Sequence, residues 1–345
     1  MKKIIQFKGW IIGAVALVAV LIAFFLPLNS YIETPGGADD LKPFVKVGGK
    51  EDQKPGKYMI TYVSLRQATP FSLVAARLNP LADVEKAQDV TGGVDNAIYN
   101  QVQSFYMQNA INEAVGIAFK TAHRTVHTKY IGIFITSLAE NSHFANDLQV
   151  GDTVTQVDGH HFDNARGYQM FLAKKSTHDK VTVTYMRNGK TRKTTRHLMD
   201  LGGRAGLGIS LADNVEVSTT PNVAVNPGSI GGPSGGLMFS LQIYDQLTGG
   251  HLRQGRKIAG TGTIDLDGYV GEIGGIDKKI VAAKKAGATI FFAPYVKPTK
   301  LNKQIDGGQT NYELAKATAK KYAPKMKVVP VATFEQAIKY LETHK

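Results

Sequence analysis

One serine of this sequence lies in a setting that could support catalysis. Ser234 belongs to the segment GGPSGG, residues 231–236, directly before a stretch that predicts a helix. A serine hydroxyl is a poor nucleophile unless a base removes its proton, and a lysine can be that base when burial depresses its pKa. The segment GGIDKKIVAAKKAG, residues 274–287, predicts a helix over residues 277–286 that opens after a glycine turn and carries four lysines.

The predicted helix separates these lysines by direction. At about 100° per residue, Lys279 lies in the middle of a small apolar face, while Lys278, Lys284 and Lys285 fall where lysines are normally solvated. The residues of that face are Ile276, Ala282, Ala283 and Ala286. Holding a lysine amine neutral near pH 7 to 8 costs about 4 kcal/mol relative to its ordinary pKa of ~10.4, so packing alone does not explain an inward lysine. The alternative is a lysine whose stem packs while its amine reaches solvent.

A histidine base is a second alternative. Ser234 satisfies the G-x-S-x-G pattern of α/β-hydrolases, which place their serine on a tight turn between a strand and a helix and need a histidine further along the chain. After Ser234 the sequence has only His251, in a nearby loop, and His344, beside the last residue. Neither position suits a triad, which favours the lysine.

The serine and lysine segments together resemble the proteolytic domain of Lon-type proteases over residues 203–294. In that family the serine lies in a D-G-P-S-A-G loop, and the lysine opens the helix after a G-x-I-G-G pattern. The resemblance implies that Ser234 is the nucleophile and Lys279 its base. It also implies that Thr261, in the segment GTGTI, orients the lysine amine.

The loop around the serine has a further implied role. By the resemblance, Gly232, Pro233 and Gly235 form the loop that admits the substrate backbone, and backbone N–H groups around Ser234 stabilise the oxyanion. Gly231 departs from the family, because an acidic residue precedes Gly-Pro-Ser there. A second difference from the family is the lack of an ATPase module, since no segment of the sequence has a phosphate-loop pattern. An enzyme of this kind is expected to use no ATP, no cofactor and no metal, and to cleave peptides, loops or disordered tails.

Over residues 130–199 the sequence pattern predicts short strands joined by turns. The segment YIGIFITSLAENSHFANDLQVGDTVTQVDG resembles a PDZ domain, in which a small-residue loop leads to a strand and an L-x-x-G-D-x-I-x-x-V-N-G-like segment follows. Such a domain binds an extended peptide at a sheet edge. The groove is expected between residues 131–136 and a following helix, lined by Ile131, Gly132, Ile133, Tyr168 and Phe171. The alternative is a β-rich module that binds no peptide.

The first thirty residues predict a membrane anchor. Residues 10–28 carry no charge, and these 19 residues (28 − 10 + 1) span roughly 28 Å, close to the ~30 Å hydrocarbon core of a bilayer. Lys2, Lys3 and Lys8 precede the span, so a cytoplasmic amino terminus and an extracellular catalytic domain are expected, with single-pass localisation at the cell membrane. A cleaved signal peptide is the alternative, but the apolar run is longer than the usual ~7–15 residues and no A-x-A-like site follows.

Composition limits the partners. The chain of 345 residues has a net charge of +13 and no cysteine, which excludes disulfides and cysteine-based catalysis. Its basic stripe, residues 166–196, could bind a polyanion, but nucleic acid is not expected outside a membrane. Phospholipid headgroups or wall polymers are the polyanions expected near the protein there. The alternative is a solvated basic face that binds no partner. The histidines at 123–127 and 160–161 lack a third ligand, so no metal site is expected.

The sequence therefore predicts an α+β multidomain protein. Residues 1–28 are expected to form a cytoplasmic stub and transmembrane helix, 29–125 a region of strands and helices, 126–199 the PDZ-like β-rich domain and 200–345 the Lon-like α/β domain. This combination resembles membrane-anchored peptidases found mainly in Gram-positive bacteria. The expected function is cleavage of secreted or surface-exposed peptides or proteins at the outer membrane face, with the bilayer as partner through residues 10–28. A non-catalytic cell-surface scaffold that binds peptides is the alternative, and a homo-oligomer is left open.

Overall fold

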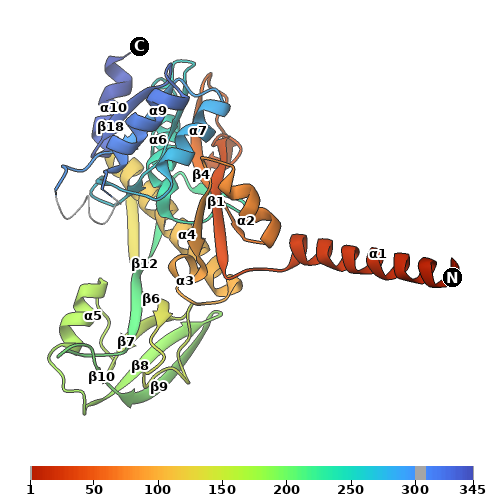
Figure 1. The fold of residues 1–345 in the computed structure, drawn as a ribbon. Coiled ribbons are helices and arrows are strands. Elements are labelled where there is room, and N and C mark those ends of the chain that lie inside the picture. The colour runs from red at the N-terminus through yellow and green to blue at the C-terminus, as the bar shows by residue number, and fades with distance from the viewer. Residues whose placement is uncertain (1, 300–307, 345) are drawn as a thin grey trace.

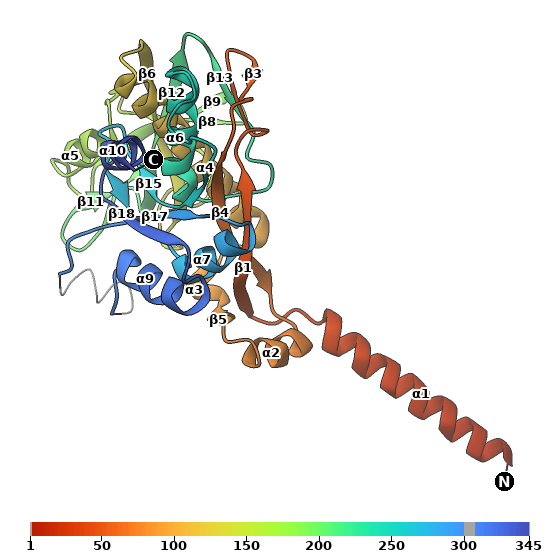
Figure 2. The same ribbon diagram turned by 90° about the horizontal axis from the view of Figure 1, so that it is seen from above.

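The computed structural model describes residues 2–299 and 308–344, and in it the chain forms two bodies and one projecting helix (Figure 1). The larger body is a sheet covered by helices on both faces, and the smaller body is mostly β-structure. Helix α1 (Lys2–Phe25) extends away from the larger body, as the view from above also shows (Figure 2).

The larger body is built on a six-stranded sheet with the strand order β18-β17-β14-β4-β1-β5. Strand β4 pairs antiparallel with β1 and parallel with β14, and β14, β17 and β18 are parallel to one another. The strands are β1 (Ser30–Asp40), β4 (Lys57–Gln67), β5 (Asp83–Lys86), β14 (Lys257–Gly260), β17 (Ile290–Pro294) and β18 (Lys327–Val331). The sheet therefore joins strands of the predicted 29–125 region to strands of the predicted proteolytic region.

Helices cover the two faces of this sheet with different partners. Alternate strand residues point to opposite faces, so Ile60 packs with α4 (Asn96–Thr121), α6 (Gly236–Leu247) and α10 (Phe334–Thr343), whereas Met59 packs with α7 (Ile276–Lys285) and α9 (Asn311–Tyr322). Helices α6 and α7 consequently lie on opposite sides of the sheet.

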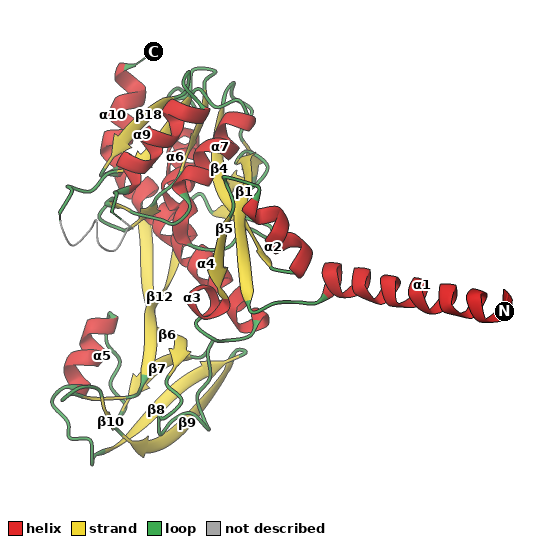
Figure 3. Ribbon diagram, viewed as in Figure 1, coloured by secondary structure: helices red, strands yellow, loops and turns green. Residues whose placement is uncertain are grey.

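The smaller body contains a five-stranded sheet with the order β12-β6-β7-β8-β9 and one helix, α5 (Ala165–Leu172). Its strands are β6 (Val126–Leu138), β7 (Thr153–Val157), β8 (Lys180–Arg187), β9 (Lys190–His197) and β12 (Ile209–Thr219). Strands β6 and β12 pair along their whole length and run from the smaller body to the larger one (Figure 3). Helix α4 contacts this ribbon, because Asn112 Nδ2 donates to the Val215 carbonyl at 2.7 Å and the rings of Phe105 and Phe134 stack with centroids 3.7 Å apart.

Short elements complete the described part of the fold. They are α2 (Pro70–Arg77), α3 (Ala87–Thr91), β2 (Val45–Val47), β3 (Lys50–Glu51), β10 (Met199–Asp200), β11 (Ala205–Gly206), β13 (Val223–Val225), β15 (Thr263–Ile264), β16 (Val270–Gly271) and the 3₁₀ helix η1 (Pro233–Gly235). Helix α2 begins with a capping box, in which Thr69 and Ser72 bond reciprocally.

The expectation of a transmembrane anchor over residues 10–28 is wrong, and with it the transmembrane part of the fold class and the single-pass membrane localisation. Within residues 2–299 and 308–344, no helix combines the length and the hydropathy needed to cross a bilayer. Helix α1 ends at Phe25, since Pro27 cannot continue it without losing an N–H bond and crowding the preceding turn.

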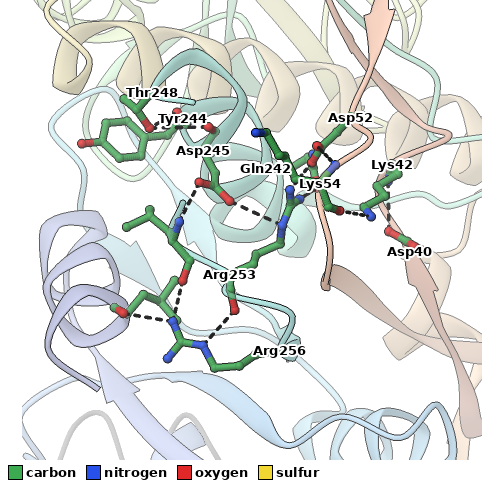
Figure 4. A network of polar contacts seen from close by, with 12 residues as sticks. Asp40, Lys42, Asp52, Lys54, Gln242, Tyr244, Asp245, Thr248, Arg253 and Arg256 are labelled. Carbon is green, nitrogen blue, oxygen red and sulfur yellow. Dashed lines mark hydrogen bonds and ion pairs between the residues drawn. The ribbon is translucent and has the colours of Figure 1, made fainter. Parts of the chain in front are cut away.

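A buried ionic network anchors α6 within the larger body (Figure 4). Arg253 is fully buried and forms ion pairs with Asp52 and, at 3.4 Å, with Asp245 on α6. Gln242, also on α6, donates to Asp52 Oδ2 at 2.9 Å. Burial raises the pKa of Asp245, whereas at Asp52 the effect of burial is outweighed by the Lys54 N–H, Gln242 and Arg253, which lower its pKa. One arginine thus holds two carboxylates from separate segments.

Candidate active site

Lys279 reaches Ser234 from the buried face of α7. Lys279 is 4% exposed, and its Nζ lies 2.9 Å from Ser234 Oγ and 3.2 Å from Thr261 Oγ1. The three residues that the sequence singled out for the chemistry therefore lie within hydrogen-bonding distance. The observed helix also agrees with the predicted one to within one residue at each end.

A glycine allows α7 to begin so close to the sheet. Gly275 precedes the helix with φ of 65°, in the left-handed region. A Cβ at Gly275 would meet Glu33 Oε1 and Val63 Cγ1 at 2.6 Å, which is closer than such atoms approach. Another residue would therefore be strained by its backbone angle and would push α7 away from β1 and β4.

The loop of Ser234 turns directly into α6. Ser234 lies in η1, and Gly232 before it has φ of 83°. A Cβ at Gly235 would lie 2.5 Å from Ile60 Cδ1, and one at Gly236 would lie 2.7 Å from Ile264 Cγ2. These two glycines are thus required by the packing of the helix start against β4 and β15.

Thr261 connects the nucleophile loop to the sheet. It directly follows β14 and is fully buried, with its N–H donating to the Phe292 carbonyl at 3.1 Å. Its hydroxyl donates to the Ser234 carbonyl at 3.0 Å. Because that hydroxyl proton is engaged, the Thr261 oxygen is left to accept from Lys279 Nζ.

Burial lowers the pKa of Lys279 to about 7, and the negative charge of Glu33 opposes this effect. An amine with this pKa is substantially neutral at physiological pH and can accept a proton.

The prediction that Lys278 lies on the solvent side of the helix is wrong. It is 2% exposed and its Nζ forms ion pairs with Glu33, Asp83 and Asp277, whereas Lys284 and Lys285 are exposed as predicted. The helical periodicity did not reveal this, because β1 and β5 supply carboxylates that cover a second side of α7.

A cleft of about 550 Å³ opens over the serine and the lysine. One wall is residues 62–65 of β4, and the opposite wall is the loop 227–231. Strand β14 ends at Gly260, which pairs with Ile60, whereas β4 continues to Gln67 and there pairs only with β1. One edge of β4 therefore lacks a strand partner within the described residues, beside the cleft.

The groove of the smaller body lies beside a different strand from the expected one. Strand β6 is between β12 and β7, and a Cβ at Gly132 would meet the Val154 carbonyl oxygen at 2.1 Å, so this part of β6 has no free edge. A cavity of about 320 Å³ lies instead between α5 and residues 205–211 at the start of β12, the edge strand. Of the five predicted residues, Ile133 and Tyr168 line it, whereas Ile131, Gly132 and Phe171 do not.

The sequence interpretation missed the residues on the strand side of this groove. They include Arg204, Leu207, Gly208 and Leu211. Gly208 has φ of 72°, and its backbone turns the chain from β11 into β12. The signal was available in the segment RAGLGISL, where two glycines flank a leucine immediately before an alternating strand.

Comparisons with known proteins match two parts of the chain. Residues 114–198 match the PDZ domain family, and residues 214–322 match the Lon protease (S16) C-terminal proteolytic domain. The crystal structure of the PDZ domain of an SdrC-like protein from Listeria monocytogenes is 27% identical and covers 24% of this chain and 90% of its own, with a TM-score of 0.23.

Two curated proteases are similar to the catalytic region. Lon protease 2 of Bacillus subtilis is 39% identical over 78 residues, and Lon protease of Heliobacterium modesticaldum is 35% identical over 88 residues. The matches cover 23% and 25% of this chain but only 14% and 11% of those proteins. The chain thus carries a PDZ domain and a Lon C-terminal proteolytic domain, and the second of these supports the activity of a serine peptidase.

Proposed function

We propose that this chain is an endopeptidase that works without ATP, with Ser234 as nucleophile and Lys279 as general base. The observation that carries the proposal is the distance of 2.9 Å between Lys279 Nζ and Ser234 Oγ at the base of a cleft. At this distance a neutral amine can take the hydroxyl proton directly. The lowered pKa of Lys279 supplies that neutral amine.

The reaction is an acyl transfer in two halves. Ser234 Oγ attacks the carbonyl carbon of the peptide while its proton passes to Lys279 Nζ. Thr261 accepts one N–H of the lysine and so directs the amine lone pair toward Ser234. The protonated lysine gives its proton to the departing amine as the C–N bond breaks, which leaves an ester on Ser234. Water that loses a proton to the same lysine then hydrolyses the ester and restores the serine.

The cleft suits an extended substrate. A peptide can add to the free edge of β4 at residues 62–65 and so bring its backbone past Ser234. The N–H groups of Gly232 and Leu237 already donate to the carbonyls of Gln103 and Gly262. The N–H of Ser234 itself, in η1 directly before α6, is our candidate for the oxyanion donor.

The PDZ domain is proposed to bind a peptide segment along β12. Its groove offers an edge strand and an apolar floor, which are the two features that strand addition needs. Peptide binding alone would also suit the alternative of a non-catalytic scaffold.

Hydrolysis of fluorescein-labelled casein by the full chain separates these functions. Ser234→Ala and Lys279→Met should each lower the rate at least about a thousand-fold, since both remove a reacting group. Ser218→Ala, an exposed serine far along β12, should retain the wild-type rate, and added ATP should change nothing. Hydrolysis that survives in the Ser234→Ala chain would disprove the assignment. A wild-type chain that binds peptides but cleaves none would favour the scaffold.

A further inference from the structure

Lys278, the residue beside the candidate base, is buried within a cluster of three carboxylates, of which Asp83 is exposed. Its Nζ contacts Glu33 of β1 at 3.5 Å, Asp277 of α7 at 3.3 Å, and Asp83 of β5. Glu33 and Asp83 are also direct partners across the β1–β5 pair. The cluster therefore fastens the first turn of α7 to two strands of the sheet.

The pKa values of the two adjacent lysines are shifted in opposite directions. At Lys278 the effect of burial is outweighed by the hydrogen bond to Asp83 and by the charges of Asp277 and Glu33, and its pKa is raised. The Lys279 amine, by contrast, contacts two hydroxyl oxygens, and burial lowers its pKa to about 7. Lys278 is consequently an ammonium group beside an amine that loses its proton at about pH 7.

Glu33 links the cluster to Lys279. It is the charged group that favours protonation of Lys279, and burial raises its own pKa although the charge of Lys278 opposes this effect. The remaining charged or titratable groups around the cluster and the cleft are Tyr31, Asp39, Tyr62, Asp83, Glu85, Tyr99 and Asp277. Glu33 also lies beneath Gly275 at the start of α7, so any change in its charge acts at the first turn of the base's helix.

We propose that Lys278 and Glu33 are a positioning pair for Lys279, in which Lys278 holds the start of α7 and neutralises the carboxylate that would otherwise keep the base protonated. The pair acts through Lys279, and the inference rests on the proposed role of Lys279 as general base. Lys278 lowers the proton affinity of Lys279 in two ways. It offsets the attraction of Glu33 for a proton on Lys279, and its own charge repels a second ammonium group.

The direct test is a titration of Lys279 in the full chain. Lysine is labelled with ¹³C at Cε, and the Lys279 resonance is identified by its loss in the Lys279→Arg chain. The wild-type midpoint should lie at about pH 7. Lys278→Met should raise the midpoint by about one pH unit, because it removes a repelling charge and leaves the Glu33 carboxylate without its counter-charge. Glu33→Gln should lower it by about the same amount, because it removes the attracting charge.

Two further variants control for side effects. Lys278→Arg keeps the positive charge and should restore a midpoint close to wild type, and Lys284→Met, on the exposed side of the same helix, should leave it unchanged. Thermal melts establish folding. If Lys278→Met does not fold, Glu33→Gln and the double variant Glu33→Gln/Lys278→Met decide, and the double variant should have a higher midpoint than Glu33→Gln because it also lacks the repelling charge of Lys278.

Opposite shifts in the two single variants would support the pair, and shifts of the same sign, or none, would overturn it. The pH of half-maximal casein hydrolysis should move with the titration midpoint. If the chain shows no Ser234-dependent hydrolysis, the proposed function is wrong. The titration midpoints of Lys279 would still show whether Lys278 and Glu33 shift its pKa in opposite directions.

Discussion

Lys279 Nζ lies 2.9 Å from Ser234 Oγ, although 45 residues separate the two along the chain. The residues come from helices on opposite faces of the central sheet, since α6 packs with Ile60 and α7 with Met59. They can meet because β14 ends at Gly260 while β4 continues, which leaves an opening between strands at this point. Thr261, the next residue, lies in that opening and contacts both.

Replacing Lys279 with methionine should abolish hydrolysis and raise stability. The pKa is about 7 in the folded chain and ~10.4 in the unfolded one, so the unfolded chain binds more protons between these values and wild-type stability rises with pH across that window. Below about pH 7 the wild type bears the whole penalty, ~5 kcal/mol, which methionine avoids. Urea unfolding should show the largest gain at about pH 6 and a small one at about pH 10. A methionine variant less stable than wild type at pH 6 would contradict burial of the amine.

The rate of hydrolysis should rise with pH through about 7, because the reactive form of Lys279 is the neutral amine. The measurement is kcat/KM for a peptide substrate across the range of about pH 5 to 9, with folding followed at each pH. A rate that rises only near pH 10, where an ordinary lysine loses its proton, would show that Lys279 is not the base.

Thr261→Val should lower kcat by about 10- to 100-fold with little change in KM, because the isosteric side chain cannot accept from Lys279 or donate to the Ser234 carbonyl. Thr261→Ser keeps the hydroxyl and should recover most of the rate. Equal rates for the valine and serine variants would mean that the hydroxyl does not orient the amine.

Arg253→Met should destabilise the chain by about 3–5 kcal/mol, because it leaves Asp52 and Asp245 buried without their common counter-charge. Arg196→Met is the matched control, since Arg196 pairs with Asp147 at the surface and should lose no more than about 1 kcal/mol. Urea unfolding of the two variants measures the difference. Similar losses would show that the buried network contributes little to α6.

Arg204 is the only charged residue among those that line the described groove of the PDZ domain. A peptide with a free carboxyl end should therefore bind more tightly than its amidated form, and Arg204→Gln should remove most of this difference. Lys193→Gln, on β9 at the other edge of the sheet, should retain it. Fluorescence anisotropy of a labelled peptide measures the affinities. Equal affinity of the two peptides for the wild-type chain would argue against a charged anchor point.

Local signals in the sequence were sufficient to select Ser234 and Lys279, which the structure brings within hydrogen-bonding distance. Ser234 stands between glycines before a helix, and the periodicity of residues 276–286 points Lys279 inward, so both were found from neighbours along the chain. The matches to a PDZ domain and to a Lon proteolytic domain confirm that the chain contains these two kinds of domain. The motifs around Ser234 and Lys279 and the patterns typical of the two domains all depend on residues that lie close together in the sequence.

Tertiary structure decided the features that depend on distant partners. Lys278 is buried because β1 and β5 bring Glu33 and Asp83 against a flank of α7 that periodicity alone assigns to solvent. The groove uses β12 because β6 has strands on both sides, and strand order is set by long-range pairing rather than by the composition of β6. Strands β1 and β4 of the amino-terminal region line the candidate active-site cleft for the same reason. The residues of a strand specify which of its faces is apolar, whereas its partner strands are selected by the whole chain.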